Sequence, residues 1–279
     1  MQVFDKTAVV KPFIKWVGGK VTNLPKLMQF VPDTIDTYVE PFVGCGAMYF
    51  GLKFNRAIIN DINAELICAY RQVRDHTAEL KALLNTFRYE KEQYLMIRSW
   101  DREPDFLKRP EVERAARLIY LIKTGYNGLY RVNKKNFNNV PLGRYEKVKI
   151  CDEERLDKCS LYLRQHETEI CNQDYYTLLD KIPPNAFVYL DPPYHPLTGT
   201  AKFTSYMPGV WAETEQRRLG EFCRELDRRG IKFMQTNSTA PLLYELYRGF
   251  NMTTVDAKRN INSDVTKRQP IKELVITNY

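Results

Sequence analysis

The stretch that most constrains the fold is residues 187–194, where four apolar residues precede an aspartate, two prolines and a tyrosine. The apolar run predicts a short buried strand, and the proline pair ends it because proline lacks the N–H that a strand ladder needs. Asp191 and Pro192 each precede a proline, which restricts both to extended conformations. The sequence therefore predicts a stiff corner at the carboxyl end of a strand, where open α/β sheets bind ligands.

The corner carries groups suited to activating an amine. Asp191 supplies a carboxylate, Pro192 a carbonyl and Tyr194 an aromatic ring. The exocyclic amine of a nucleobase is a poor nucleophile because its lone pair is delocalised into the ring, and two acceptors for its N–H groups favour a more pyramidal nitrogen. An aromatic ring stacked on the base would hold it in register, as in enzymes that extrude a base from the duplex. A plain strand-ending turn explains the same residues equally well.

Length and composition are those of an ordinary globular protein. The 279 residues suffice for one large domain, or for one domain with a sizeable insertion, and 44% are hydrophobic and 27% charged. No apolar run approaches membrane-spanning length and residues 1–10 lack a signal-peptide core, so we expect a cytoplasmic protein with no membrane partner. The six cysteines form no C-x-x-C pair and only three histidines are present, so we expect reduced cysteines and no metal.

The net charge of +8, from 42 basic and 34 acidic residues, favours a polyanionic partner without establishing one. Residues 123–149 hold seven Lys or Arg against one Glu, interleaved with the aromatic residues Tyr126, Tyr130, Phe137 and Tyr145. Their Gly, Asn and Pro content predicts loops or a hairpin. A mobile solvated loop rarely carries so many aromatic rings without a stacking partner, so this segment is a candidate DNA or RNA surface.

Four residues of this segment have side chains suited to reading nucleic acid. Arg131 and Arg144 can contact phosphates or guanine edges. Asn127 can contact a base or a backbone, and Leu129 a thymine methyl group.

Residues 11–20 end in a glycine pair that predicts a tight turn, followed by a helix over residues 23–30. Trp16 can stack on a flat ligand and Lys20 can pair with a carboxylate. By themselves, a core tryptophan and a solvated lysine are the more common outcome for such residues.

A strand over residues 37–40 leads into a glycine-rich turn, where Gly44 and Gly46 let a ligand approach the backbone beside a helix N-terminus. A second strand ends at Asp61. An acidic residue about 20 positions beyond such glycines commonly accepts hydrogen bonds from ribose hydroxyls. Asp61 can instead cap the next helix, although Asn63 is available for that role. The spacing favours a nucleoside site.

The rest of the chain alternates helices and strands without internal repeats, which predicts an α/β fold. Helices are predicted from residue 64 onwards, over 111–123, around 219–226 and over 241–247, and strands over 231–235 and 273–277. Thr77 is placed to cap the helix that contains residues 80–87, and Gly230 to end the helix before the strand at 231.

Taken together, residues 13–20, 40–46, 60–63, 125–145 and 191–194 resemble the Dam-type, class α, amino-directed DNA adenine methyltransferases, in that family's order. The resemblance implies a Rossmann-like methyltransferase fold with an inserted, mainly helical target-recognition domain that contains a β-hairpin loop. It implies a catalytic, S-adenosylmethionine-binding domain of residues 1–63 and 151–279 and a DNA target-recognition domain of residues 64–150. The methyl donor would be converted to S-adenosylhomocysteine, with no metal.

The resemblance also implies roles for individual residues. Asp191, Pro192 and Tyr194 would form the catalytic corner. Cofactor contacts would come from Trp16, Lys20, Phe42, Gly44, Gly46, Asp61 and Asp191. DNA contacts would come from Lys15, Tyr126, Asn127, Leu129, Arg131, Pro141, Arg144 and Tyr145, with the ring of Tyr126 able to insert into the base stack. The family pattern has a phenylalanine at the positions of Asn138 and Leu142, so this chain departs from it in the hairpin.

We therefore expect methyl transfer to adenine N6 in double-stranded DNA, with base flipping, and similarity in the recognition segment suggests the target GATC. The sequence leaves two alternatives open: an enzyme that acts alone, and one with a cognate restriction endonuclease as a partner acting at the same site. Thr198, Thr200, Thr204 and Ser205 can contact backbone phosphate, whereas His195 is expected to be incidental, because attack on a sulfonium methyl needs no prior general base. The rival functions are methylation of RNA or of cytosine N4, and DNA binding without catalysis.

Overall fold

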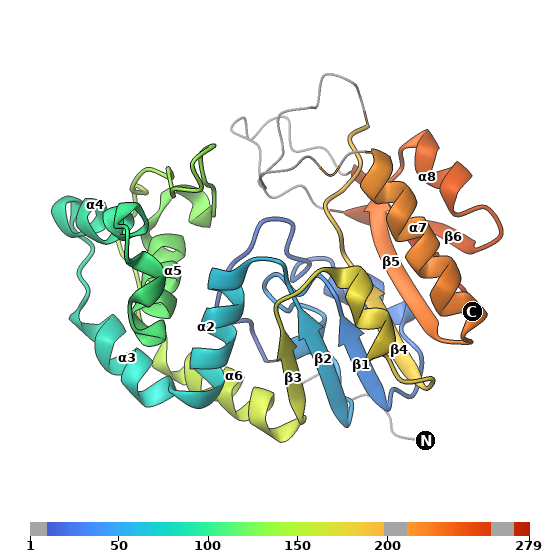
Figure 1. Cartoon of the computed structure of the whole chain (residues 1–279), viewed down its shortest axis with the longest axis horizontal. Helices are drawn as coiled ribbons and strands as arrows, with labels where there is room; N and C mark the ends of the chain where they lie inside the picture. Colours follow the sequence, from blue (N-terminus) through green and yellow to red (C-terminus); the bar gives the residue numbers. More distant parts are fainter. Residues whose placement is uncertain (1–9, 198–210, 212, 258–270) are drawn as a thin grey trace.

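The computed structural model describes residues 10–197, 211, 213–257 and 271–279. Its centre is a seven-stranded sheet in the order β3-β2-β1-β4-β5-β7-β6 (Figure 1). The strands are β1 Thr37–Glu40, β2 Arg56–Asn60, β3 Thr168–Cys171, β4 Ala186–Leu190, β5 Lys232–Ser238, β6 Asn251–Ala257 and β7 Ile271–Thr277. The first five strands are parallel, and β7 runs antiparallel to both β5 and β6. The predicted α/β, Rossmann-like sheet is confirmed.

The strand order decides where a site can form. β1 pairs with β2 on one side and with β4 on the other, so the chain turns in opposite directions from β1. The carboxyl ends of β1, β2 and β4 therefore lie next to one another at a topological switch point. The loops that follow Glu40, Asn60 and Leu190 meet there, although they are far apart in the sequence.

Helices cover both faces of the sheet, and the alternation of side chains along a strand explains why β4 is apolar throughout. The helices are α1 Leu24–Leu27, α2 Ala64–Asp75, α3 Thr77–Thr86, α4 Lys91–Ser99, α5 Glu111–Thr124, α6 Glu153–Gln165, α7 Glu213–Arg228 and α8 Pro241–Leu246. Phe187 and Tyr189 of β4 face the cluster that includes α1, α2 and α6, whereas Val188 and Leu190 face the cluster that includes α7 and α8. No helix in the described part of the chain is both long and apolar enough to cross a bilayer.

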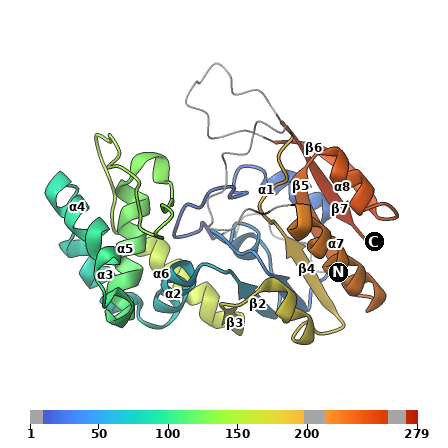
Figure 2. The ribbon, with the colours of Figure 1, turned by 45° about the horizontal axis from the view of Figure 1, so that its top comes forward.

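The helices α3, α4 and α5 lie beyond α2, away from the sheet (Figure 2). One hydrophobic cluster continues from the sheet through α2 to α3 and α5, and a smaller one joins α4 to α5 through Tyr94, Ile97, Tyr120 and Leu121. The division of the chain at residues 63/64 and 150/151 stays a prediction.

Residues 125–143 form a hairpin that is fastened to this helical end. Bridges pair Gly125 with Leu142 and Val132 with Asn138. The carboxylate of Asp101 accepts a hydrogen bond from the backbone N–H of Asn138 at 2.6 Å and forms a buried ion pair with Arg117 at 2.7 Å. Leu142 packs against the α4–α5 cluster, so the departure from the family pattern at this position leaves the hairpin intact.

Local predictions were mostly right, with two errors and several omissions. The helix expected beside the glycine-rich turn is only a short 3-10 turn, Tyr49–Gly51, which is followed by β2. Thr77 does not cap α3: the N-cap is His76, and the Thr77 hydroxyl donates to the carbonyl of Val73 at 2.5 Å instead. β5 continues to Ser238, three residues beyond its predicted end. The sequence patterns did not identify β3, β6, α4 or α6.

Removing the buried carboxylate at the base of the hairpin should destabilise the protein. In Asp101→Ala, the Arg117 guanidinium, whose side chain is 3% exposed, loses its ion-pair partner. We expect the free energy of unfolding to fall by about 3 kcal/mol, measured by urea denaturation.

The matched control is Asp105→Ala, because the Asp105–Lys108 pair is 72% and 80% exposed. Its effect should stay below about 1 kcal/mol. Equal effects of the two substitutions would contradict the importance of the buried pair.

Candidate active site

The corner after β4 is held by an ion pair and a hydrogen bond to the same oxygen. Lys20 Nζ lies 2.9 Å from Asp191 Oδ1, and the Thr236 hydroxyl donates to that oxygen at 2.8 Å. The Lys20 side chain is only 6% exposed. Burial is the largest single influence and would lower the pKa of Lys20, but Asp191, Tyr189 and Glu273 together outweigh it and raise this pKa. Lys20 is therefore buried and charged, and it is not the solvated lysine that is common at such a position.

The two anchoring contacts leave acceptors available at the corner. Both reach Oδ1 of Asp191, and none of the described residues donates a hydrogen bond to Oδ2 or to the carbonyl of Pro192. The next carbonyl, that of Pro193, is already occupied, because it accepts from Gln216 Nε2 at 2.9 Å. The corner thus has one carboxylate oxygen and one carbonyl to which no described residue donates a hydrogen bond.

Residues of β5 and α7 fix the chain beyond the prolines. Asn237 Oδ1 accepts from the backbone N–H of His195 at 3.1 Å, and the Ser238 hydroxyl donates to the His195 carbonyl at 2.6 Å. Asn237 also donates to Gln216 at 3.1 Å, which links this support to the bond on Pro193. His195 serves through its backbone here, and its ring Nδ1 is buried without a partner among the described residues.

Tyr194 turns its ring towards the ion pair. The ring centroid is 4.6 Å from Lys20 Nζ, a cation–π distance. Its hydroxyl and Oε2 of Glu273, on β7, are both buried without a hydrogen-bond partner in the described part of the structure. Burial raises the pKa of both groups. The Tyr194 ring therefore lies against the Lys20 ammonium, and its hydroxyl lies near Glu273 and Thr236.

Sequence reasoning missed Thr236 and Glu273. The polar run 235–238 at the end of a buried strand was a usable signal for Thr236, since buried polar groups need partners. Glu273 is 6% exposed and directly precedes the apolar run 274–276 of β7, but no recognisable motif surrounds it.

The glycine-rich turn after β1 is tied to the end of β2. Gly44 and Gly46 have φ of +47° and +69°, and a Cβ on Gly46 would lie 2.7 Å from the Tyr70 hydroxyl. The N–H of Gly44 donates to Asp61 Oδ2 at 3.1 Å, and its carbonyl accepts from Tyr70 at 3.0 Å. Glycine is therefore required at both positions, and the bare backbone of this turn lies beside the carboxylate of Asp61.

The structure separates the two roles considered for Asp61. Asn63 caps α2, because its Oδ1 accepts from the N–H of Leu66 at 2.9 Å. Asp61 Oδ1 accepts from the N–H of Asn63 at 2.9 Å, so this carboxylate supports the turn and does not cap the helix. Burial raises the pKa of Asp61 to about 6, although the two N–H donors oppose the shift.

Two aromatic residues border this region on different sides. Trp16 is half-buried and stacks on Tyr130 with ring centroids 5.1 Å apart and planes at 21°. Phe42 is also half-buried and packs against Tyr175 and Trp211, at centroid distances of 5.0 Å and 5.5 Å. The fold thus brings Trp16, Lys20, Asp61 and Asp191 to one edge of the sheet, with Phe42 on the side of α7.

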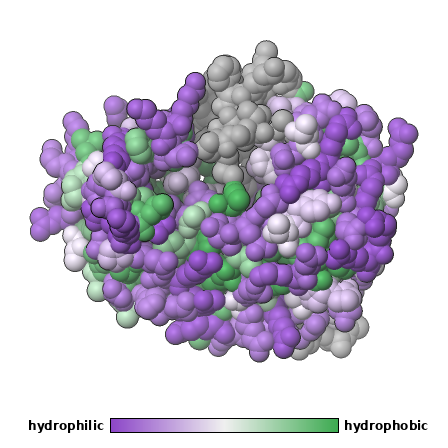
Figure 3. Space-filling model, viewed as in Figure 1, coloured by the Kyte–Doolittle hydropathy of each residue, from purple (hydrophilic) through white to green (hydrophobic). Residues whose placement is uncertain are grey.

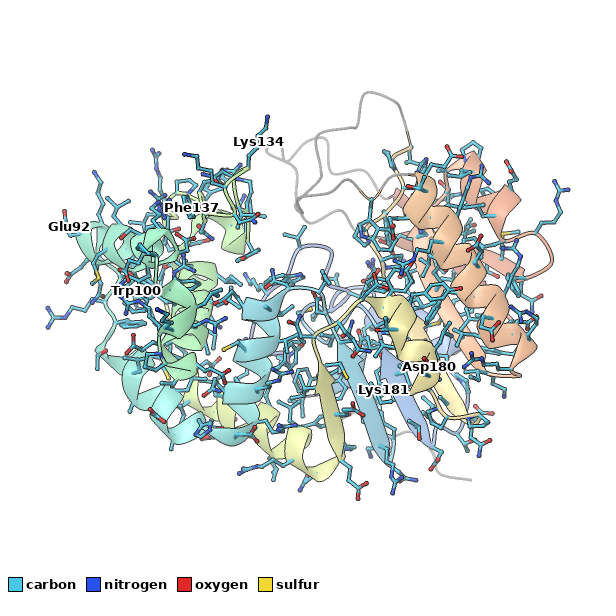
Figure 4. All side chains as sticks on the ribbon, in the orientation of Figure 1. Glu92, Trp100, Lys134, Phe137, Asp180 and Lys181 are labelled. Carbon is cyan, nitrogen blue, oxygen red and sulfur yellow. The ribbon has the colours of Figure 1, made fainter. Side chains whose placement is uncertain are left out.

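The predicted DNA-contacting residues gather on and beside the hairpin. Leu129 is half-buried, and the other seven are exposed: Lys15, Tyr126, Asn127, Arg131, Pro141, Arg144 and Tyr145. The face seen in Figure 3 is largely hydrophilic over this end of the molecule, and Lys134 extends from the hairpin tip (Figure 4). Arg131 donates to Asn139 Oδ1 at 2.7 Å, which holds its guanidinium along the hairpin. The proposed phosphate contacts Thr198, Thr200, Thr204 and Ser205 lie outside the described residues.

No cluster of three or more His, Cys, Asp or Glu with a metal-binding arrangement occurs among the residues that the structure describes. The groups gathered at the sheet edge are instead carboxylates, carbonyls, one buried ammonium and aromatic rings. This set suits an amine and a nucleoside.

Comparison with known proteins agrees with this chemistry. Residues 16–261 match the family model of the D12 class N6 adenine-specific DNA methyltransferases, and the chain belongs to this family of enzymes. The family acts on DNA, and its methyltransferases generally use S-adenosylmethionine.

Individual relatives cover nearly the whole chain. The chain is 41% identical over 282 residues to the type II methyltransferase M1.LlaDCHI of Lactococcus lactis subsp. cremoris, covering 100% of this chain and 99% of that protein. It is 41% identical over 294 residues to the type II methyltransferase M.MjaIII of Methanocaldococcus jannaschii, covering 97% and 99%. The DNA adenine methylase of Escherichia coli K12 is 31% identical over 265 residues, covering 95% and 94%.

The raised pKa of Asp61 gives a pH dependence with a defined sign. A carboxyl whose pKa rises on folding from its ordinary 3.8 to about 6 binds more protons in the folded state within that window. The contribution of Asp61 to the free energy of unfolding should therefore fall as pH rises from about 4 to about 6, and then level off.

Urea unfolding of the wild type and of Asp61→Asn between pH 4.5 and 7.5 measures this effect, because other titrating groups cancel in the difference. The wild type should lose stability relative to the variant as pH rises. If the free energy of unfolding of the wild type, minus that of Asp61→Asn, increases with pH, the raised pKa of Asp61 is refuted.

Proposed function

We propose that the protein transfers a methyl group from S-adenosylmethionine to N6 of an adenine that is flipped out of duplex DNA. The observation that carries the proposal is a pair of acceptors to which no described residue donates, Asp191 Oδ2 and the Pro192 carbonyl, next to Asp191 Oδ1 and the Pro193 carbonyl, which are already bonded. Two such acceptors match the two N–H groups of an exocyclic amine.

Asp191 and Pro192 would each accept one N–H of the target amine and favour a pyramidal nitrogen with its lone pair out of the ring plane. Lys20 and Thr236 would keep the carboxylate in this orientation, so little reorganisation is needed at the moment of reaction. Tyr194 would stack on the flipped base. Holding amine and methyl donor in line supplies much of the expected rate, because the entropic cost is met on binding.

The residues around the glycine-rich turn fit a nucleoside-bearing methyl donor. Asp61 is placed to accept ribose hydroxyls beside the bare backbone of Gly44 and Gly46, with Trp16 and Phe42 as aromatic walls. Lys20 would complete this side through its ion pair with Asp191. When bound, S-adenosylmethionine supplies an electrophilic methyl group on a sulfonium.

We further propose that residues 64–150 recognise the DNA target, with the exposed hairpin residues as its contacts. Lys15, Asn127, Leu129, Arg131, Pro141, Arg144 and Tyr145 would contact DNA, and Tyr126, 46% exposed, would insert into the base stack. The similarity of this segment to Dam-type enzymes supports GATC as the target. The names of the type II relatives support a cognate restriction endonuclease as a partner.

Removing the carboxylate of the corner should abolish most methyl transfer. In Asp191→Ala, the rate of tritium transfer from labelled S-adenosylmethionine to duplex DNA should fall by about 100-fold or more, as for loss of a preorganised transition-state contact. Asp191→Asn keeps the shape of the residue, but its single oxygen would remain on Lys20 and Thr236 and its NH2 donor would replace the acceptor Oδ2. A fall of similar size is therefore expected for Asp191→Asn.

The control is Asp174→Ala, since Asp174 forms a surface pair with Arg218 and is 43% exposed. Circular dichroism would verify that each variant folds. Retention of most of the rate in folded Asp191→Ala would disprove the acceptor role.

Methylation should protect GATC sites in plasmid DNA. Treated plasmid should resist an endonuclease that is blocked by adenine methylation in GATC and become sensitive to one that requires it. Mass spectrometry of nucleosides should find N6-methyladenine. N4-methylcytosine would overturn the proposed chemistry, and N6-methyladenine without protection would overturn only the target sequence.

A further inference from the structure

We propose that Tyr130 is a positioning residue that couples DNA contact at the hairpin to cofactor binding, because its ring supports Trp16 against the glycine-rich turn. The inference rests on the proposed function and assigns to Tyr130 a role that neither the DNA-contacting nor the cofactor-contacting set contains.

A continuous series of contacts runs from the hairpin to the glycine-rich turn. Tyr130 stacks on Trp16 at 5.1 Å and 21°. Trp16 in turn lies against Gly44 so closely that a Cβ there would be 3.0 Å from its Cδ1. The N–H of Gly44 is bonded to Asp61. A shift of the Tyr130 ring is therefore transmitted through Trp16 to the backbone that faces the nucleoside site.

A second contact lies beside the stack of Tyr130 on Trp16. The preceding residue, Lys15, packs its side chain on Gly128, where a Cβ would be 3.3 Å from its Cδ. Two successive residues before the glycine pair thus meet the segment 128–130. The turn that precedes α1 therefore packs against residues 128–130 of the hairpin.

The side chains of Tyr130 and Arg131 point in different directions. Leu129 is extended, with φ −79° and ψ 146°, so neighbouring side chains alternate between two sides. Arg131 is exposed and bonded to Asn139 along the hairpin, whereas Tyr130 is directed inwards. Burial raises the pKa of Tyr130, and hydrogen bonding by the nearby Asn63 side chain opposes this shift. The Tyr130 ring thus lies against Trp16, on the side of the segment away from Arg131.

The consequence is a mechanical link between two ligands. DNA held by Leu129 and Arg131 restrains the backbone of the residue between them, and with it the Tyr130 ring. A restrained ring holds Trp16 in one orientation, so the cofactor site becomes preorganised when DNA is bound. Thermodynamic reciprocity then requires that the cofactor strengthen DNA binding by the same factor.

Isothermal titration of the full chain with S-adenosylhomocysteine, with and without a duplex that contains GATC, tests the link. In the wild type the duplex should tighten binding by about 5-fold or more, in the usual range of coupling between sites. The coupling ratio is the Kd for S-adenosylhomocysteine without duplex divided by the Kd with duplex. Tyr130→Leu should bring this ratio close to one, whereas Tyr130→Phe, which keeps the ring, should preserve it.

The matched control is Phe137→Leu, since Phe137 belongs to the same hairpin but packs on Arg102, at 5.4 Å, and not on Trp16. It should leave the ratio unchanged. A second readout is tryptophan fluorescence, which should change on addition of duplex in the wild type and much less in Tyr130→Leu.

The outcomes separate the two proposals. A wild-type protein that binds neither S-adenosylhomocysteine nor duplex would defeat the proposed function itself. If the wild type binds S-adenosylhomocysteine and duplex but its coupling ratio is one, only the coupling role of Tyr130 is wrong. The same holds if Tyr130→Leu keeps the wild-type coupling ratio. Thermal melting of Tyr130→Leu, compared with Tyr130→Phe, identifies a loss that comes from misfolding.

Discussion

The buried ion pair between Lys20 and Asp191 is the interaction on which the arrangement of the site depends. Charges removed from water are tolerated only when paired and hydrogen-bonded, and here the Gly18 carbonyl and the Thr236 hydroxyl complete the pairing. The pair joins the turn before α1 to the strand end after β4. Since the loss of either charge would leave the other buried without a partner, the same interaction fixes the local fold and orients the carboxylate.

The order of the strands explains why this pairing is available. β1 lies between β2 and β4, so the glycine-rich turn, Asp61 and the proline corner share one edge of the sheet. The antiparallel β7 then places Glu273 beside the same corner, in register with Ser238 of β5. The residues of the site come from segments spread over most of the chain, and the topology alone brings them together.

The sequence predicted the parts of this fold that local pattern controls. The apolar runs of β1, β2 and β4, the glycine turn and the proline corner follow from propensity and sterics. β6 escaped detection because it is an edge strand with mostly exposed residues, and Thr77 was misplaced because its hydroxyl has a competing acceptor on the preceding turn. The burial of Lys20 and the presence of Thr236 and Glu273 depend on contacts between distant segments, which no local pattern reports. Charge and aromatic content located the hairpin residues in the sequence. They did not predict that the Tyr130 side chain points inwards.

The anchoring of the hairpin by Asp101 has a consequence for how sequences are discriminated. A reading element that is already ordered loses little conformational entropy when it enters a groove, so more of its contact energy remains for affinity. The same stiffness prevents the element from refolding around a wrong base pair. A mismatch would then leave donors and acceptors unsatisfied, and the enzyme would reject it through that penalty.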